Sequence, residues 1–112
     1  MRIAGFYQEF WSPAFGVPTG AVTEFLAASP YQDADRITAY LRSGYEMISA
    51  MGITRDLLGS GEQFAGGDSL FTDGEWLWRG DTWHYVCLHH MRLPEEFLAR
   101  VRDDDYVIPA VE

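Results

Sequence analysis

The clearest local signal in the chain is Leu70-Phe71-Thr72-Asp73-Gly74-Glu75-Trp76-Leu77-Trp78. Two runs of β-prone residues flank the dipeptide Asp73-Gly74. This dipeptide favours a two-residue type I′ turn, because both central residues of that turn need a positive φ. In that register Phe71 lies opposite Trp76 across the two strands. The stretch therefore predicts a β-hairpin over residues 70–78.

The segment before the hairpin predicts a helix over about residues 33–43. Asp33 is a suitable N-cap residue, and the apolar residues at 37, 40 and 41 share one helical face. A competing start is Ser29, because Pro30 suits the first position of a helix.

The end of this helix has two interpretations. Gly44 is a natural left-handed terminator, and residues 45–53 would then form a mostly buried strand. Alternatively, the helix continues to Met51, because helical spacing of apolar residues persists that far. We prefer the helix that ends at Gly44.

Two further helices are expected after the hairpin. Asp81 is a suitable N-cap for a helix over about residues 81–91, in which Cys87 lies on the apolar stripe as an inert core thiol. Pro94 suits the first position of a helix over about residues 94–102, with acidic residues near its start and arginines near its end.

The remaining segments carry weaker patterns. Residues 3–11 fit an edge strand or a short helix, and residues 19–28 fit a short helix. Four glycines within residues 59–68 predict a mobile surface loop. The whole chain, residues 1–112, is therefore expected to be a single α+β domain. Its small antiparallel sheet, with the 70–78 hairpin, would pack against helices at about residues 33–43, 81–91 and 94–102.

The charge balance excludes several classes of function. The chain has 17 acidic residues against eight arginines and no lysine, which gives a formal net charge of −9. Nucleic-acid binding and docking on an anionic membrane both need a basic surface, so we expect neither partner. Eleven of the acids lie in residues 57–112. An acidic half with several tryptophans suits a protein-binding surface.

No pattern in the sequence predicts a cofactor or a metal. His84, His89 and His90 do not form the pair spaced by four residues that places two ligands on one helical face. Cys87 is the only cysteine, which excludes an intrachain disulfide and favours the reducing cytoplasm. No nucleophile or phosphate-binding motif is present, so we expect no enzymatic activity.

The acidic half supplies the candidate partner-binding residues. The tryptophans at 76 and 78 alternate along a strand and so share one face, and most such residues belong to a core. The acids around them could frame a contact surface in either case. The candidate partner-binding residues are Asp73, Glu75, Trp78, Asp81, Asp103, Asp104 and Asp105.

Several stretches together resemble one group of proteins. These are Tyr31-Gln32-Asp33-Ala34-Asp35-Arg36-Ile37-Thr38-Ala39-Tyr40-Leu41-Arg42-Ser43-Gly44, Ser69-Leu70-Phe71-Thr72-Asp73-Gly74-Glu75-Trp76-Leu77-Trp78, His84-Tyr85-Val86 and Leu93-Pro94-Glu95-Glu96-Phe97. Over about residues 31–98 the chain resembles small cytoplasmic proteins of Streptomyces and related actinobacteria, a group similar to the immunity proteins of polymorphic toxin systems. The shared motifs mark turns and helix ends rather than catalytic sites.

The resemblance implies an acidic, cytoplasmic immunity protein that binds a cognate toxin domain and blocks its active site. Many toxin domains act on nucleic acid through basic clefts, which an acidic partner can reach quickly and occupy. The alternative is a small enzyme or a regulatory ligand-binding domain encoded in an actinobacterial operon.

Overall fold

The computed structural model describes residues 1–110 and has an α+β architecture, as the sequence predicts. The strands are β1 (Arg2–Ile3), β2 (Tyr45–Ile48), β3 (Ile53–Arg55), β4 (Gln63–Ala65), β5 (Leu70–Thr72) and β6 (Trp76–Arg79). The helices are α1 (Ala34–Arg42), α2 (Thr82–Leu88) and α3 (Glu95–Asp103), with short 3-10 turns at Pro13–Phe15 and Val22–Phe25. Among the described residues, no helix is long and apolar enough to cross a membrane.

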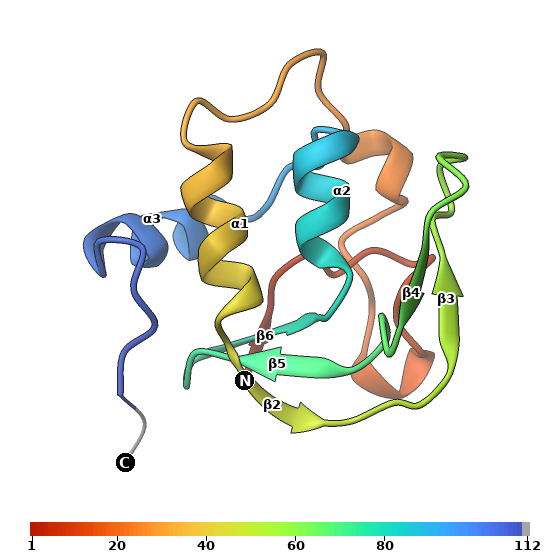
Figure 1. The fold of residues 1–112 in the computed structure, drawn as a ribbon, viewed down its shortest axis with the longest axis horizontal. Helices are drawn as coiled ribbons and strands as arrows, with labels where there is room; N and C mark the ends of the chain where they lie inside the picture. Colours follow the sequence, from red (N-terminus) through yellow and green to blue (C-terminus); the bar gives the residue numbers. More distant parts are fainter. Residues whose placement is uncertain (111–112) are drawn as a thin grey trace.

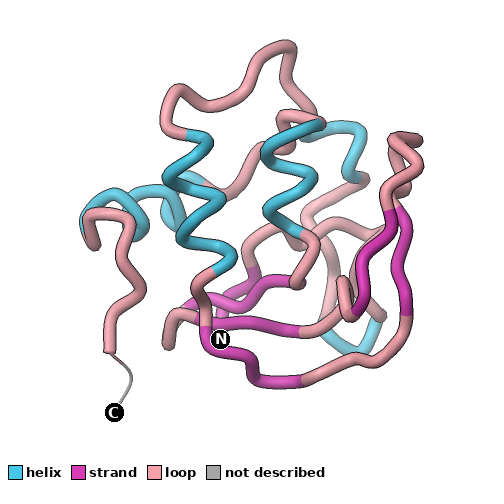
Figure 2. The backbone as a smooth tube through the Cα atoms, in the orientation of Figure 1, coloured by secondary structure: helices cyan, strands magenta, loops and turns pink. Residues whose placement is uncertain are grey.

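The strands form two sheets, and α1 and α2 stand side by side over the larger one (Figure 1). Its four strands are ordered β1-β6-β5-β2, while β3 and β4 form a separate two-stranded ribbon (Figure 2). The predicted antiparallel pairing is correct for β6, β5 and β2. It is wrong for β1, which runs parallel to β6. The ribbon places β4 inside the predicted glycine-rich loop at 59–68.

The 70–78 hairpin forms, but its predicted register is wrong by two residues. Phe71 lies opposite Trp78 rather than Trp76. The cause is the Asp73 side chain, whose Oδ1 accepts hydrogen bonds from the backbone N–H groups of Glu75 (3.0 Å) and Trp76 (2.8 Å). The two central residues are therefore Gly74 and Glu75. Only Gly74 has a positive φ (101°), which excludes the predicted type I′ turn.

The core is built around three aromatic rings from three elements. Trp78 of β6 and Phe97 of α3 lie 5.6 Å apart between ring centroids, and Tyr40 of α1 lies about equally close to both, at 6.0 and 6.1 Å. All three are fully buried. The indole N–H of Trp78 donates to the carbonyl of Leu41 (2.9 Å), which satisfies the one polar atom that the ring brings into the core.

The first helix ends where predicted, but for a different reason. Gly44 is not in the left-handed region. A Cβ at this position would instead lie 2.6 Å from the Trp78 ring, so glycine is needed for close approach of the backbone to the core. The strand that follows ends at Ile48, and all four of its residues are exposed, contrary to the predicted buried strand over residues 45–53.

The second helix is shorter than the predicted 81–91. It ends at Leu88, and the carbonyl of Tyr85 accepts from the N–H groups of both His89 and Met91 (3.1 Å each). His90 then adopts a positive φ of 59°. Its buried residues are Thr82, His84, Tyr85 and Val86, which differ from the predicted apolar stripe. Cys87 is exposed rather than a core thiol.

The segments near the N-terminus follow the sequence patterns only in part. Residues 3–11 contribute only the end of β1, and residues 19–28 hold the 3-10 turn at Val22–Phe25 instead of an α-helix. The first long helix begins after Asp33, not after Ser29. The Asp33 carboxylate does not cap this helix, because it accepts hydrogen bonds from Arg102 and Tyr106 instead.

Candidate functional site

Three of the predicted partner-binding residues lie in the interior. Trp78 is 0% exposed, Asp73 1% and Asp81 2%. Their burial overturns their assignment to a contact surface, because none of them offers area to a partner. Glu75 remains exposed and pairs with Arg100, whose Nη1 lies 2.7 Å from Glu75 Oε2.

The second predicted acidic patch stays on the surface. Asp103 and Asp105 are exposed, and Asp104 is half-buried. The run begins at Asp103, the last residue of α3, and Asp105 lies 3.6 Å from Arg36 while Asp104 lies 3.7 Å from Arg100. Since two of its three carboxylates are exposed, residues 103–105 can still face a charged partner.

Asp73 joins the hairpin to two helices. Its Oδ2 accepts from the hydroxyl of Tyr40 on α1 (2.6 Å) and from Nε of Arg100 on α3 (2.9 Å). Burial alone would raise the pKa of Asp73, but these bonds and the two turn N–H groups hold it below the ordinary value. Asp73 is therefore a structural residue.

Asp81 belongs to a smaller buried ion pair. Its Oδ2 lies 2.9 Å from Nη2 of Arg79 and 3.4 Å from Oγ1 of Thr54, which connects the end of β6 to the β3–β4 ribbon. Burial raises the pKa of Asp81, and Arg79 offsets this only in part.

The most prominent exposed apolar surface was not predicted. It lies on β2 and the residues after it, where five large apolar side chains are exposed within nine residues. We call this surface the β2 edge: Tyr45 (46% exposed), Met47 (53%), Ile48 (57%), Met51 (97%) and Ile53 (68%). β2 is the last strand of the four-stranded sheet and pairs only with β5 among the described strands. Neighbouring unpaired backbone groups and apolar side chains are typical of a protein-binding edge.

A groove continues from the β2 edge toward the ribbon. Its volume is about 620 Å³, and its lining includes Glu46 and Met51, together with Phe64 of β4, Phe71 of β5 and Trp83 of α2. The groove gives a partner side chain a place beside the exposed strand.

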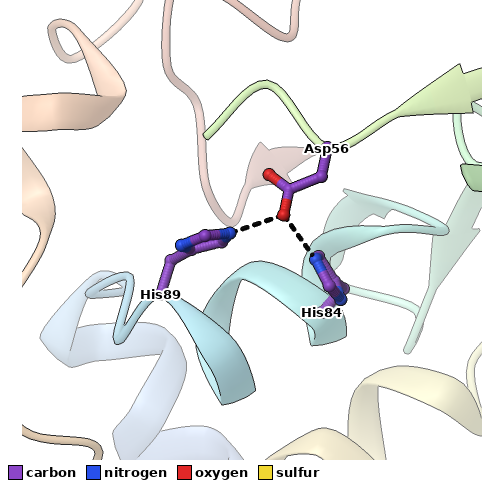
Figure 3. Close-up of side chains that lie close together, drawn as sticks. All are labelled: Asp56, His84 and His89. Carbon is purple, nitrogen blue, oxygen red and sulfur yellow. Dashed lines mark hydrogen bonds and ion pairs between the residues drawn. The ribbon is translucent and has the colours of Figure 1, made fainter. Parts of the chain in front are cut away.

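A second feature brings together three residues that the sequence separates. The carboxylate of Asp56 lies between the imidazoles of His84 and His89 (Figure 3). Asp56 Oδ2 is 2.8 Å from Nε2 of His84 and 2.5 Å from Nε2 of His89. The Asp56 side chain is 0% exposed, that of His84 7% and that of His89 17%.

Local structure holds the carboxylate of Asp56 in place. Asp56 directly follows β3, its backbone N–H donates to the carbonyl of Glu62 (3.0 Å), and its Oδ1 accepts from the N–H of Leu58 (2.8 Å). Burial alone would raise the pKa of Asp56, but hydrogen bonds from His89, Ser60 and His84 hold it well below the ordinary value.

The helical-spacing argument against a histidine pair is therefore wrong for this chain. His84 lies in the first turn of α2, whereas His89 is the residue just after the helix. His89 is the C-cap residue, whose N–H still donates to the carbonyl of Tyr85, and its side chain reaches the same carboxylate oxygen as His84. Only knowledge of where α2 ends and of the path of residues 56–62 could have indicated this cluster.

The chain matches no protein-family model, no curated protein and no solved structure.

Proposed function

We propose that this chain is a protein-binding module that contacts its partner through the β2 edge. The observation that carries the proposal is the exposure of five large apolar side chains within nine residues on and just after β2, a strand that pairs only with β5 among the described strands. Edge strands of stable domains are commonly protected by charge, proline, a bulge or a covering segment. β2 carries Glu46 and a register irregularity between Glu46 and Ile48, but it contains no proline. An extended segment of a partner can pair with such an edge and place alternate side chains in the neighbouring groove.

The partner we propose is a basic toxin domain, which the protein would inhibit as a cytoplasmic immunity protein. We base this choice on the net charge of −9 and on the proposed resemblance of about residues 31–98 to small actinobacterial cytoplasmic proteins, a group similar to immunity proteins. An acidic protein associates with a basic partner faster than a neutral protein does. The apolar contact at the β2 edge would then slow dissociation. The exposed carboxylates at 103 and 105 contribute to this long-range attraction.

The test uses the purified product of the neighbouring gene and a charge placed on the β2 edge. We expect the double substitution Met47→Lys and Ile48→Lys to weaken binding at least about tenfold, because it places two cations where apolar contact is made with a basic partner. The matched control is Val17→Lys, which adds a cation at a side chain that is 91% exposed and outside the β2 edge. The control should bind like the parent protein.

Asp103, Asp104 and Asp105 are tested separately, all changed to Ser. We expect slower association and a weaker dependence of the association rate on salt, with little change in dissociation. Binding that is lost in this variant but intact in the Met47→Lys, Ile48→Lys variant would assign the contact to the acidic run instead. If the neighbouring protein does not bind at all, the immunity proposal is wrong.

A further inference from the structure

We propose that Asp56, His84 and His89 form a binding site for a divalent first-row transition-metal ion, with zinc the foremost candidate. The site is independent of the β2 edge, and its ligands would be one carboxylate oxygen and two imidazole nitrogens. This donor set is one that zinc and iron(II) commonly accept in proteins.

The positions of the three donor atoms fit a single ion. All three lie within 4.8 Å of one another. Bonds of about 2.0–2.1 Å to a common metal would place the donors about 3.0–3.4 Å apart. The Asp56 Oδ2 atom is now 2.8 and 2.5 Å from the two nitrogens, so each imidazole needs to withdraw by less than about 1 Å. His89 lies outside the helix and can make that adjustment by rotation of its side chain.

Electrostatics favours a cation at this position. The other buried or half-buried aspartates in ion pairs each have an arginine: Asp73 and Asp104 with Arg100, Asp81 with Arg79, and Asp33 with Arg102. Among the described residues, Asp56 forms ion pairs only with the two imidazoles, although its side chain is 0% exposed. A buried carboxylate without a permanent positive charge is costly, and a divalent ion would supply that charge.

A metal ion would enter the site from the side of His84, and its fourth coordination position would face the same side. A groove of about 490 Å³ is lined there by Ser60, Glu62, His84 and Cys87. The hydroxyl of Ser60 lies 3.5 Å from Nε2 of His84. Three protein ligands with a fourth position facing a groove leave room for water or an anionic group on the metal.

The test measures zinc binding directly, with chelator-treated protein and equilibrium dialysis against zinc. We expect one equivalent of bound zinc. Long-range ¹H–¹⁵N spectra should show the metal on Nε2 of His84 and of His89, with the proton on Nδ1. Cobalt(II) serves as a second probe, because its visible absorption reports low-coordinate nitrogen and oxygen ligation.

Three variants separate this site from adventitious binding. His89→Gln keeps a hydrogen-bonding side chain but removes a ligand, so its zinc affinity should fall at least about tenfold. Asp56→Asn should have the same effect. The matched control is His90→Asn, which removes the third histidine and suits a residue with positive φ. This control should bind zinc like the parent protein.

Circular dichroism of each variant without metal checks that it is folded. If Asp56→Asn does not fold, His89→Gln alone decides the question, because His89 lies at the edge of the cluster. The proposal is overturned if the parent protein binds no stoichiometric zinc. It is equally overturned if a folded His89→Gln variant binds zinc as tightly as His90→Asn.

Discussion

Asp73 receives hydrogen bonds from four donors and is the residue on which the hairpin depends. Two are backbone N–H groups of the turn, and the others are the hydroxyl of Tyr40 and Nε of Arg100. These four donors stabilise the ionised form of the buried carboxylate and fix the geometry of the turn. Asp73, a predicted partner-binding residue, is thus the centre of a buried polar network.

Replacing this carboxylate should be costly. We expect Asp73→Asn to lower the free energy of unfolding by about 2–4 kcal/mol, because Arg100 would lose its buried counter-charge and the single amide oxygen of Asn cannot serve both the turn N–H groups and the donors Tyr40 and Arg100. The matched control is Glu75→Gln, whose exposed pair with Arg100 should contribute less than about 1 kcal/mol. Urea unfolding measures both. Equal midpoints for the Asp73→Asn variant and the parent would show that the network does not support the fold.

Stability should fall in acid because of several such carboxylates. A hydrogen bond from Arg102 lowers the pKa of Asp33 to about 2, and the pKa values of Asp56 and Asp73 are also lowered. An unfolded Asp titrates near about 3.9, so the unfolded state binds protons first as the pH falls. The stabilisation from these groups is present above about pH 4 and is lost as the pH falls toward 2. Asp81, with a raised pKa, acts in the opposite direction.

The melting temperature, measured by circular dichroism from pH 6 to pH 2, checks this dependence. The parent protein should lose stability mainly below about pH 4. The Asp33→Asn variant should be less stable at pH 6, and its melting temperature should fall less steeply below pH 4. The reason is that it lacks the Asp33 carboxyl, whose pKa is lowered in the folded state. Identical slopes for the two proteins would contradict the assignment to Asp33.

At the scale of elements, local patterns predict α1 and α3 to within about two residues of their observed bounds. Capping positions and apolar spacing are local properties, and both helices bury the face that the spacing indicates. The hairpin was predictable for the same reason. Its register was not, because the side chain of Asp73 and the packing of Trp78 select it. The end of α2 and the exposure of β2 likewise depend on neighbours distant in the sequence.

The junction between α1 and β2 offers a sharp test of packing. Gly44→Ala should lower the free energy of unfolding by about 1–3 kcal/mol, because its Cβ would lie 2.6 Å from the Trp78 ring and 3.2 Å from the carbonyl oxygen of Thr72. The matched control is Gly52→Ala, where a Cβ meets nothing within 4 Å and φ is not positive. This control should be neutral or more stable by up to about 1 kcal/mol. Thermal and urea unfolding distinguish the two, and equal effects would contradict the close approach.

At the scale of the whole molecule, the candidate sites combine segments that no local pattern links. Composition gives the net charge of −9. It does not reveal which acids are buried, because the partners that bury them include distant residues: Arg100 of α3 for Asp73, and Thr54 beside the adjacent Arg79 for Asp81. The Asp56 cluster needs the ribbon and the end of α2 to meet, and the β2 edge needs the strand order of the sheet. These are properties of topology.

Amide hydrogen exchange at Tyr45–Ile48, measured with and without the partner, tests protein binding through the β2 edge most directly. The outward amides of an edge strand have no strand partner in the free protein and gain hydrogen bonds when another strand pairs with them. In the complex we expect their exchange to slow at least about tenfold, together with the exchange of neighbouring residues 49–53. Unchanged exchange over residues 45–53 in a fully formed complex would contradict the proposal.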